Sequence, residues 1–422
     1  MTYTTYRNQE LYCEDVPVRE LAEEYGTPLY VYSKSEMIES YRSIDSAFGD
    51  YPHLVCYALK ANANAAILKL FSGENAGADV VSAGELYLAL KAGFAPDKIV
   101  FAGVGKREDE IEYALQQNIF AFNAESVSEL QAISRAALRL NTTARVSLRI
   151  NPDIDAESHP YITTGLHSNK FGIESSKAIE VYRYAKSLPS ITLTGIHTHI
   201  GSQITKVEPF VATAQFIVRL LDQLREAGIH LTHIDFGGGV GVKYVNAIRN
   251  EALPAEDGVQ DSQPAAADVI RAVLPVLQPS GCSIWVEPGR ALVAEAGMLV
   301  TRVIYLKENG AKKFFVVDAA MTDLLRPSLY QAYHQIVPAL LDTYERVRAD
   351  VVGPVCESGD FLARDRMLPK VKQNDVLAVL TAGAYGFVTA SHYNGRPRPA
   401  EVLVNGERVR LIRPRETFEH LL

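Results

Sequence analysis

Residues 54–62 read LVCYALKAN, and this stretch decides the fold. The first six residues are nearly all apolar and lack polar alternation, which is typical of a strand buried in a parallel sheet. Lys60 follows directly, before a polar turn into a helix. Loss of hydration lowers the pKa of a lysine amine, so Lys60 could act as a nucleophile and form a Schiff base with a carbonyl. Taken alone, the lysine could equally be a snorkelling side chain at a strand end.

Further apolar segments repeat this pattern, and helix-length segments separate them. The expected strands are residues 54–59, 78–82, 98–102, 119–122, 145–150, 192–199, 232–236 and 284–287. Eight strand–helix units in about 250 residues favour an α/β fold of the TIM (β/α)8 barrel type over an open doubly wound sheet. Because a barrel gathers the carboxyl ends of its strands at one face, we expect one site at that face.

The last part of the chain changes character. Strand-like segments separated by turns occupy residues 298–306, 313–318, 375–380, 401–404 and 408–412. Asn405-Gly406 between the last two is a strong hairpin signal, and residues 28–32 read as a strand that could pair with this sheet. We therefore expect three parts: an N-terminal segment that joins the β domain, a cofactor-binding barrel, and an all-β domain, over residues 1–35, 36–295 and 296–422.

The composition limits the possible functions. The chain has 422 residues and a formal net charge of −8, so it offers no basic surface for nucleic acid, while small charged substrates stay possible. No apolar stretch approaches the ~20 residues of a membrane span, and the first residues do not resemble a signal peptide. The four cysteines show no CxxC spacing. We expect a soluble, cytoplasmic protein with reduced thiols and with no nucleic-acid or membrane partner.

A glycine run follows the seventh expected strand. Residues 235–241 read DFGGGVG, and Gly237, Gly238 and Gly239 would let backbone N–H groups approach a phosphate closely. Such a run is common in ordinary turns. Its place after barrel strand seven, where phosphate sites recur in this fold, favours an anion site.

A carboxylate and a guanidinium follow the eighth expected strand, at Glu287 and Arg290 of the sequence EPGR. A buried pair of this kind could be structural. Because the carboxylate would lie at the same barrel face as Lys60, it could instead keep a pyridinium nitrogen protonated.

Two histidines, His197 and His199, end the sixth expected strand. Side chains at i and i+2 of a strand point the same way and could bind a metal ion. No third ligand with suitable spacing is evident, so we predict no metal site and favour aromatic stacking by one of the histidines.

These motifs together resemble those of the fold-type III pyridoxal-phosphate decarboxylases, which belong to the alanine racemase-like barrel family, and specifically those of the diaminopimelate decarboxylases. The resemblance runs nearly end to end, and that family combines a TIM barrel with a β domain. The matching segments are residues 57–62 (YALKAN), 77–82 (GADVVS), 149–152 (RINP), 170–172 (KFG), 199–203 (HIGSQ), 237–239 (GGG), 287–290 (EPGR), 326–330 (RPSLY) and 356–360 (CESGD).

The resemblance implies pyridoxal 5'-phosphate (PLP) as the cofactor and indicates the residues that hold it. Lys60 would bind it as a Schiff base, His199 would stack on its ring, and Glu287 would pair with its pyridinium nitrogen. The phosphate would be held by Gly237, Gly238, Gly239, Ser202 and Tyr385.

The implied reaction is the decarboxylation of meso-2,6-diaminopimelate to L-lysine and CO2, the last step of lysine biosynthesis. Arg290, Arg326 and Tyr330 would bind the carboxylate at the unreacting end of this amino acid, because a planar guanidinium matches a carboxylate bidentately. A phosphate role for Arg290 stays open, and Tyr385 would also contact the substrate.

Cys356 and Glu357 lie in the expected β domain, whereas Lys60 lies in the barrel. In the family this loop comes from the partner subunit, which implies a homodimer with shared active sites. Cys356 would deliver a proton to the substrate carbon, and Glu357 would bind the distal ammonium. A small buried hydrophobe is the usual alternative for a free cysteine.

Other activities on the same fold stay open. A related decarboxylase could act on ornithine, lysine or another diamino acid, although ornithine decarboxylases carry an aspartate after the cysteine. An alanine racemase would need a catalytic tyrosine in place of the loop at Cys356. A homologue that binds the cofactor without catalysis is a third alternative, which the joint presence of Arg326, Tyr330, Cys356 and Glu357 argues against.

Overall fold

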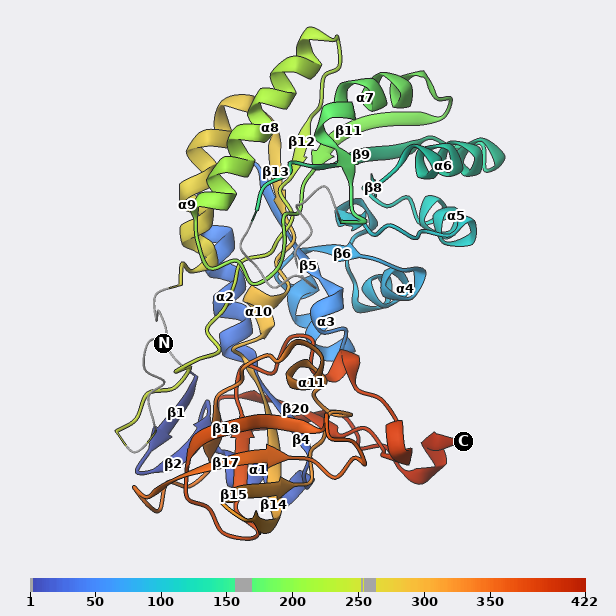
Figure 1. Cartoon of the computed structure of the whole chain (residues 1–422). Coiled ribbons are helices and arrows are strands. Elements are labelled where there is room, and N and C mark those ends of the chain that lie inside the picture. The colour runs from blue at the N-terminus through green and yellow to red at the C-terminus, as the bar shows by residue number, and fades with distance from the viewer. Residues whose placement is uncertain (1–2, 156–168, 252, 254–262) are drawn as a thin grey trace. The chain divides into compact units, whose positions relative to one another are not determined.

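Two compact units make up the chain (Figure 1). The barrel unit comprises Ser40–Gly241 and Gln263–Ala291, and the sheet unit comprises Met1–Glu39, Val242–Ser262 and Leu292–Leu422. The domain boundaries expected at residues 36 and 296 stay predictions. The structure is a computed structural model, and the residues it describes are 3–155, 169–251, 253 and 263–422.

The barrel unit contains the expected closed sheet. Within the described residues, parallel strands pair in the order β5-β6-β7-β8-β9-β11-β12-β13, and β13 pairs with β5 to close the ring. This confirms the predicted TIM barrel. The strands are β5 His53–Ala58, β6 Gly77–Val80, β7 Ile99–Phe101, β8 Ala121–Ala124, β9 Ala144–Asn151, β11 Ile191–His197, β12 His233–Asp235 and β13 Ser283–Val286, and the short β10 Ile173–Glu174 pairs with β9.

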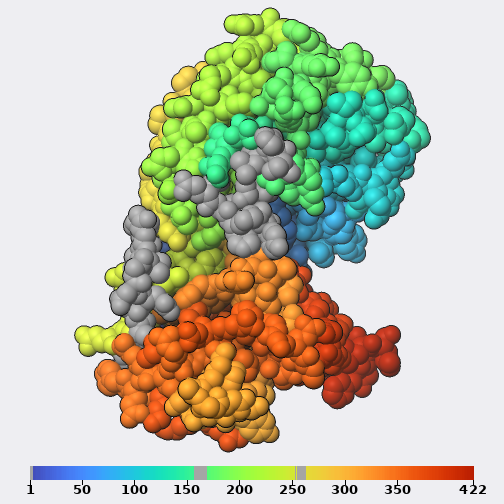
Figure 2. Space-filling view, in the orientation of Figure 1, coloured from blue at the N-terminus to red at the C-terminus, as the bar shows by residue number. Residues whose placement is uncertain are grey.

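Helices alternate with these strands, and short polar side chains start several of them. Asn64, Ser82 and Ser126 each accept a hydrogen bond from a backbone N–H of the first turn, which satisfies a donor that the helix leaves open. Helices α4 to α6 form part of the surface of the barrel unit, in blue to teal (Figure 2). The helices are α2 Lys34–Ser46, α3 Ala65–Gly73, α4 Ala83–Ala92, α5 Glu108–Gln116, α6 Val127–Arg139, α7 Ala178–Ser187, α8 Glu208–Glu226 and α9 Ala266–Leu277.

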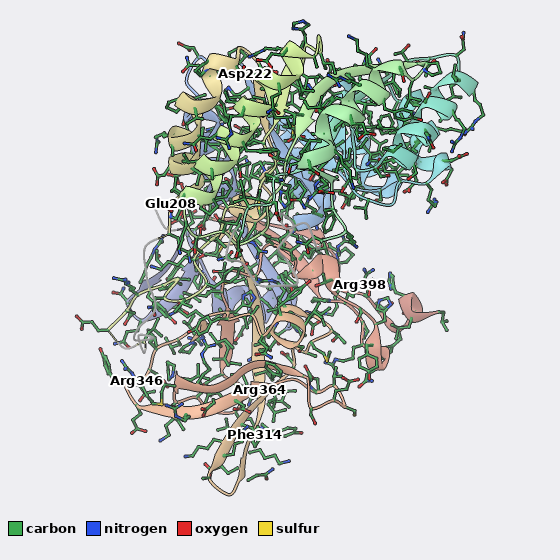
Figure 3. All side chains as sticks on the ribbon, turned by 45° about the horizontal axis from the view of Figure 1, so that its top comes forward. Glu208, Asp222, Phe314, Arg346, Arg364 and Arg398 are labelled. Carbon is green, nitrogen blue, oxygen red and sulfur yellow. The ribbon has the colours of Figure 1, made fainter. Side chains whose placement is uncertain are left out.

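Helix α8 is the long helix that Figure 3 marks with Glu208 and Asp222. Apolar side chains along it, including Phe210, Ile217 and Leu224, are buried, whereas Asp222 is exposed. This spacing gives α8 one apolar face, as expected for a helix that covers a barrel. No helix among the described residues is long and apolar enough to cross a membrane.

The sheet unit is built around the N-terminal strand β4. β4 (Leu29–Ser33) pairs antiparallel with β14 (Gly297–Asn309) and parallel with β20 (Ala400–Asn405), which confirms the predicted pairing of an N-terminal strand with the C-terminal sheet. The strand order is β18-β17-β15-β14-β4-β20-β21, and β19 pairs with β14 and β16. The other strands are β15 Lys312–Val317, β16 Ile336–Pro338, β17 Arg346–Val352, β18 Phe361–Pro369, β19 Val376–Val379 and β21 Arg408–Arg413.

Some elements of the sheet unit were not predicted. Strands β17 and β18 carry charged residues such as Arg346 and Arg364, which Figure 3 labels, so they do not read as apolar runs. Strand β16 is only three residues long and ends in Pro338. The remaining elements are the small sheet of β1 Thr4–Arg7, β2 Glu10–Cys13 and β3 Val16–Pro17, and the helices α1 Val18–Tyr25, α10 Arg290–Val293 and α11 Arg326–Tyr330.

A ring cluster fills the barrel near the start of its strands. Trp285, the single tryptophan of the chain, stacks on Phe120 with ring centroids 3.9 Å apart. His233 lies 5.7 Å from Trp285, and its Nε2 is 2.8 Å from Ser147 Oγ. A side chain at Gly195 would collide with the His233 ring, because its Cβ would lie 2.3 Å away. The histidine is therefore a packed part of the barrel core.

The buried His233 should make stability depend on pH. Burial lowers the pKa of His233 from 6.5 to about 4, because the charged form would lose its hydration. An unfolded histidine binds its proton near pH 6.5, so the stabilisation is fully present above that pH and is lost as the pH falls towards about 4. We expect a loss of about 3 kcal/mol in the free energy of unfolding over this range.

Urea unfolding between pH 4 and pH 7, followed by the fluorescence of Trp285, measures this loss. His233→Gln should reduce the slope of the free energy of unfolding with pH more than His230→Gln, the matched control at an exposed position three residues earlier. An equal slope in both variants would assign the acid loss to other groups.

Candidate active site

The carboxyl ends of the strands bring the predicted lysine to a buried carboxylate. Lys60 follows β5, and Asp79 lies in the neighbouring β6. The Nζ atom of Lys60 donates to Oδ2 of Asp79 over 2.7 Å; the Asp79 side chain is fully buried, whereas 36% of the Lys60 side chain is exposed. The amine is therefore held by an ion pair as well as by partial burial, and sequence reasoning had assigned no role to Asp79.

A second cluster of buried polar groups lies at neighbouring strand ends. His197 ends β11, Asp235 ends β12 and Glu287 follows β13. One candidate ligand atom from each lies within 4.8 Å of the others, and no other group of this kind occurs among the described residues. Asn123 of β8 bridges the two carboxyl groups, since its Nδ2 donates to Asp235 Oδ2 at 2.8 Å and to Glu287 Oε1 at 3.3 Å.

This cluster adds to what the sequence indicated. The sequence showed no third ligand with suitable spacing for the pair His197 and His199, and the structure places two carboxyl groups beside His197, without His199. The reason is that Asp235 and Glu287 come from separate strands, and only barrel closure places them side by side. The absence of a metal site stays a prediction.

Burial and charge set the protonation of these carboxyl groups. Burial, followed by the charge of Glu287, raises the pKa of Asp235 well above its usual value. Burial also acts to raise the pKa of Glu287, but His197, 3.3 Å away, together with Lys60 and a hydrogen bond with Asp235, outweighs it and lowers this pKa. Burial and the charge of Glu287 raise the pKa of Asp79, against the effect of Lys60. Glu287 is therefore the carboxyl group that stays anionic most readily.

His199 lies in the turn after β11, because that strand ends at His197 and not at residue 199 as predicted. Its Nδ1 accepts a hydrogen bond from the backbone N–H of Gly238 over 3.2 Å. Burial, then the charges of Arg149 and Lys60, lowers its pKa well below 6.5. His199 is therefore a neutral ring oriented by a hydrogen bond, and such a ring can stack on a flat ligand.

The glycine run packs tightly against the neighbouring turns. A Cβ at Gly237, Gly238 or Gly239 would lie 2.3 Å from a backbone oxygen, of Thr198, Glu287 and Gly201 respectively. Gly237 and Gly239 also have positive φ angles, of 69° and 107°. The N–H of Gly237 donates to Asp235 Oδ1, and that of Gly238 to His199. These two glycines therefore support the site by close backbone approach, and their N–H groups are used within the protein.

Ser202 and Arg290 lie together at the same end of the barrel unit. Arg290 is buried, and its Nη2 donates a hydrogen bond to Ser202 Oγ with an N–O distance of 3.0 Å. A hydroxyl and a guanidinium are both suited to an anionic oxygen, so this pair can extend the glycine run into a phosphate site.

In the sheet unit, Arg326 is held by aromatic groups. It is buried, its guanidinium lies 4.6 Å from the ring centroid of Tyr244, and its Nη1 is 2.7 Å from Nε2 of His334. Nδ1 of His334 lies 2.8 Å from the carbonyl oxygen of Leu380, which favours a neutral imidazole whose Nε2 accepts from the arginine. Tyr330 ends the same short helix, α11.

The loop with Cys356 and Glu357 is anchored beside α11. Ser328 Oγ of α11 donates to the carbonyl oxygen of Gly359 over 2.6 Å, and Asp360 accepts the N–H groups of Met321 and Val355. Cys356 and Glu357 are both exposed. The structure therefore brings the predicted residues Arg326, Tyr330, Cys356 and Glu357 onto one part of the sheet unit, with the cysteine exposed rather than buried as a small hydrophobe.

Neighbouring residues of the sheet unit were missed by sequence reasoning. Tyr393 donates its hydroxyl to Glu357, and Asn394 Oδ1 accepts the N–H of Cys356 over 3.0 Å. Tyr385 lies earlier in the same stretch of chain, with a φ of 56°. Nothing in the local pattern around residue 393 marks it, because its contact with residue 357 depends on the fold.

The arrangement fits the cofactor expected from the sequence. It provides an amine, a buried carboxylate kept anionic, a neutral imidazole, and a glycine turn packed so closely against neighbouring backbone that it has no room for side chains.

The assignment of the glycine turn to the phosphate predicts that Gly238→Ala weakens PLP binding at least about tenfold, because the new Cβ collides with the carbonyl oxygen of Glu287.

Titration of the cofactor-free protein with PLP, followed by absorbance, measures this affinity. Gly105→Ala is the matched control, since no atom lies within 4 Å of its added Cβ. Equal affinity in both variants would contradict the assignment of the glycine turn.

Comparisons with known proteins agree with this site. Residues 34–294 match the family model described as "Pyridoxal-dependent decarboxylase, pyridoxal binding domain". A diaminopimelate decarboxylase of Aquifex aeolicus is 45% identical over 420 residues, covering 100% of this chain and 96% of that protein. One from Vibrio cholerae is 46% identical over 423 residues, covering 100% and 98%. The crystal structure of diaminopimelate decarboxylase from Helicobacter pylori complexed with L-lysine is 42% identical, with a TM-score of 0.89 over 96% of this chain and 98% of that one. This chain therefore belongs to the diaminopimelate decarboxylase family of pyridoxal-dependent decarboxylases.

Proposed function

We propose that this protein catalyses the PLP-dependent decarboxylation of meso-2,6-diaminopimelate to L-lysine and CO2. The full-length similarity to diaminopimelate decarboxylases is the observation that carries this proposal. The amine and carboxylate groups of the barrel mouth and the arginine–cysteine–glutamate set of the sheet unit support it.

Lys60, Glu287 and His199 would hold the cofactor ring. When bound, PLP supplies an electron sink for the electron pair left behind as CO2 departs. Lys60 would bind it through its amine, Glu287 would keep the pyridine nitrogen protonated, and the neutral imidazole of His199 would pack on the ring. Gly237, Gly238, Gly239, Ser202 and Tyr385 would line the phosphate site. Because the N–H groups of Gly237 and Gly238 are already donated within the protein, these two glycines would contribute by their close backbone approach and not as donors.

Arg290 would contribute on the phosphate side, because its guanidinium is hydrogen-bonded to Ser202. A shared role at the substrate carboxylate stays compatible with this position, since a guanidinium has five N–H donors.

The sheet unit would recognise the far end of the substrate. Arg326 and Tyr330 would bind the carboxylate that is not lost, and Glu357 would bind the distal ammonium, with Tyr385 as a further contact. Cys356 would deliver a proton to the carbon that loses CO2, and its exposure on an anchored loop is compatible with this role.

The active site would be shared between two subunits. The proposed proton donor Cys356 and the proposed cofactor lysine Lys60 belong to different units of the chain. A cytoplasmic homodimer, in which each subunit supplies its Cys356 loop to the partner, would complete two equivalent sites.

A decarboxylase of ornithine or lysine is the alternative function. Those substrates lack the distal carboxylate and would not form the proposed ion pair with the buried Arg326. The expected penalty is on the order of 3 kcal/mol, enough for over a hundredfold preference for diaminopimelate. Product analysis with meso-diaminopimelate, ornithine, arginine and lysine tests the proposal, and equal rates on ornithine or lysine would overturn it.

Replacement of the arginine should narrow this preference. We expect Arg326→Ala to lower kcat/KM on meso-diaminopimelate at least about a hundredfold and to change kcat/KM on lysine much less. The reason is that only diaminopimelate has a distal carboxylate, which loses its guanidinium partner in this variant. Steady-state kinetics on both substrates measure the ratio. Arg348→Ala, at an exposed position on β17, is the control and should leave the ratio unchanged.

Subunit exchange tests the shared site. Lys60→Ala and Cys356→Ala should each be inactive, and a mixture should recover activity because a heterodimer can contain one site with neither defect. Activity after mixing is compared with the fraction of heterodimer, measured by native mass spectrometry. Heterodimers without recovered activity would place both residues in one subunit's site.

A further inference from the structure

Asp235 is a buried carboxyl group to which the reaction described above gives no role. It ends β12, between His197 at the end of β11 and Trp285 of β13, which are its partners in the strand register. Its Oδ1 accepts the N–H of Gly237 at 3.1 Å, and its Oδ2 accepts Nδ2 of Asn123 at 2.8 Å. Both oxygens therefore have fixed donors, which determine the orientation of the carboxyl group.

Asp235 and Glu287 cannot both be anions at low cost in this environment. Both are buried, and their nearest oxygens lie within 4.8 Å of each other. Two carboxyl groups that share such a site retain one proton between them, because repulsion between like charges is strong where water is excluded.

The other ionisable groups that face the pair do not supply enough positive charge. The Lys60 ammonium is paired with a third carboxylate, Asp79, at 2.7 Å, and the Cys56 thiol nearby carries no positive charge. His197 Nε2 lies 3.3 Å from Oε2 of Glu287, whereas Asn123 donates to the other oxygen, Oε1. The neutral His199 adds no positive charge. One proton on the pair therefore gives the better charge balance.

We propose that Asp235 is a positioning residue for Glu287: it carries the proton that the two carboxyl groups share and donates it to Glu287. Glu287 then stays an oriented anion with one oxygen directed by Asp235 and Asn123. This proposal rests on the assignment of Glu287 to the pyridine nitrogen, which it deepens by naming the groups that keep Glu287 charged.

The backbone supports this arrangement. The N–H of Glu287 donates to the carbonyl oxygen of Gly237 over 2.7 Å, and the N–H of Thr198 donates to the carbonyl oxygen of Asp235 over 2.9 Å. The peptide groups at the ends of β11, β12 and β13 are thus joined directly, which fixes the spacing of the backbone positions from which the two carboxyl groups extend.

Infrared difference spectroscopy of the full-length protein in D2O tests the shared proton. Wild type minus Asp235→Asn should contain the carbonyl band of a protonated carboxylic acid at neutral pH, with and without PLP. In a Glu287→Gln background Asp235 no longer faces an anion, so its pKa should fall. As the pH is raised, the band in the same subtraction should therefore disappear at a lower pH than it does with Glu287 present. Absence of the band at neutral pH, or a band that is insensitive to Glu287→Gln, would overturn the proposal.

Cofactor binding gives an independent measurement. Asparagine can still donate to Glu287, so Asp235→Asn should bind PLP more tightly than Asp235→Ala, by about tenfold. Asp222→Asn on the exposed part of α8 is the control for a changed net charge and should bind as wild type does. Equal affinity of the asparagine and alanine variants would overturn the positioning role. The infrared result needs neither substrate nor turnover, so failure of the proposed function would be seen separately, as absence of lysine formation.

Discussion

Charge balance among buried groups at the carboxyl ends of the barrel strands is the constraint on which the rest of the site depends. Asp79, Asp235 and Glu287 are buried; Asp79 pairs with the Lys60 ammonium at 2.7 Å, and Asp235 and Glu287 lie beside each other. Removal of charges from water is unfavourable unless each has a partner, so the positions of Lys60, His197 and Asn123 follow from the need to compensate these carboxyl groups. The same compensation leaves an anion at Glu287 and a neutral ring at His199.

The fold was largely predictable because buried parallel strands leave a clear signal. Several of the expected segments are short apolar runs, and all eight form strands of the closed sheet among the described residues. Boundaries were less accurate. The expected strand over residues 192–199 ends at His197, since the following residues bend to hydrogen-bond with the turn after β12. In the sheet unit, β17 was missed because its exposed face carries arginines, so that it alternates in polarity.

The candidate site was predictable only in part. Lys60, Glu287 and the glycine run stand at strand ends, where a barrel gathers its functional groups. Asp79 and Asn123 are polar residues within otherwise apolar strands. Their roles depend on partners that are distant in sequence: Lys60 for Asp79, and the carboxyl pair Asp235 and Glu287 for Asn123. Local sequence does not contain that information. The contact of Tyr393 with Glu357 was inaccessible for the same reason.

The central place of β4 in the sheet unit has a consequence for synthesis of the chain. Val31 of β4 pairs with Met298 on one side and with Val402 on the other. This strand is therefore synthesised early, whereas both of its partners belong to the last third of the 422-residue chain. Contacts this distant in sequence form slowly, and an unpaired apolar strand can pair with other chains in the meantime. Until β20 leaves the ribosome, β4 is therefore a segment that a chaperone would need to shield from aggregation.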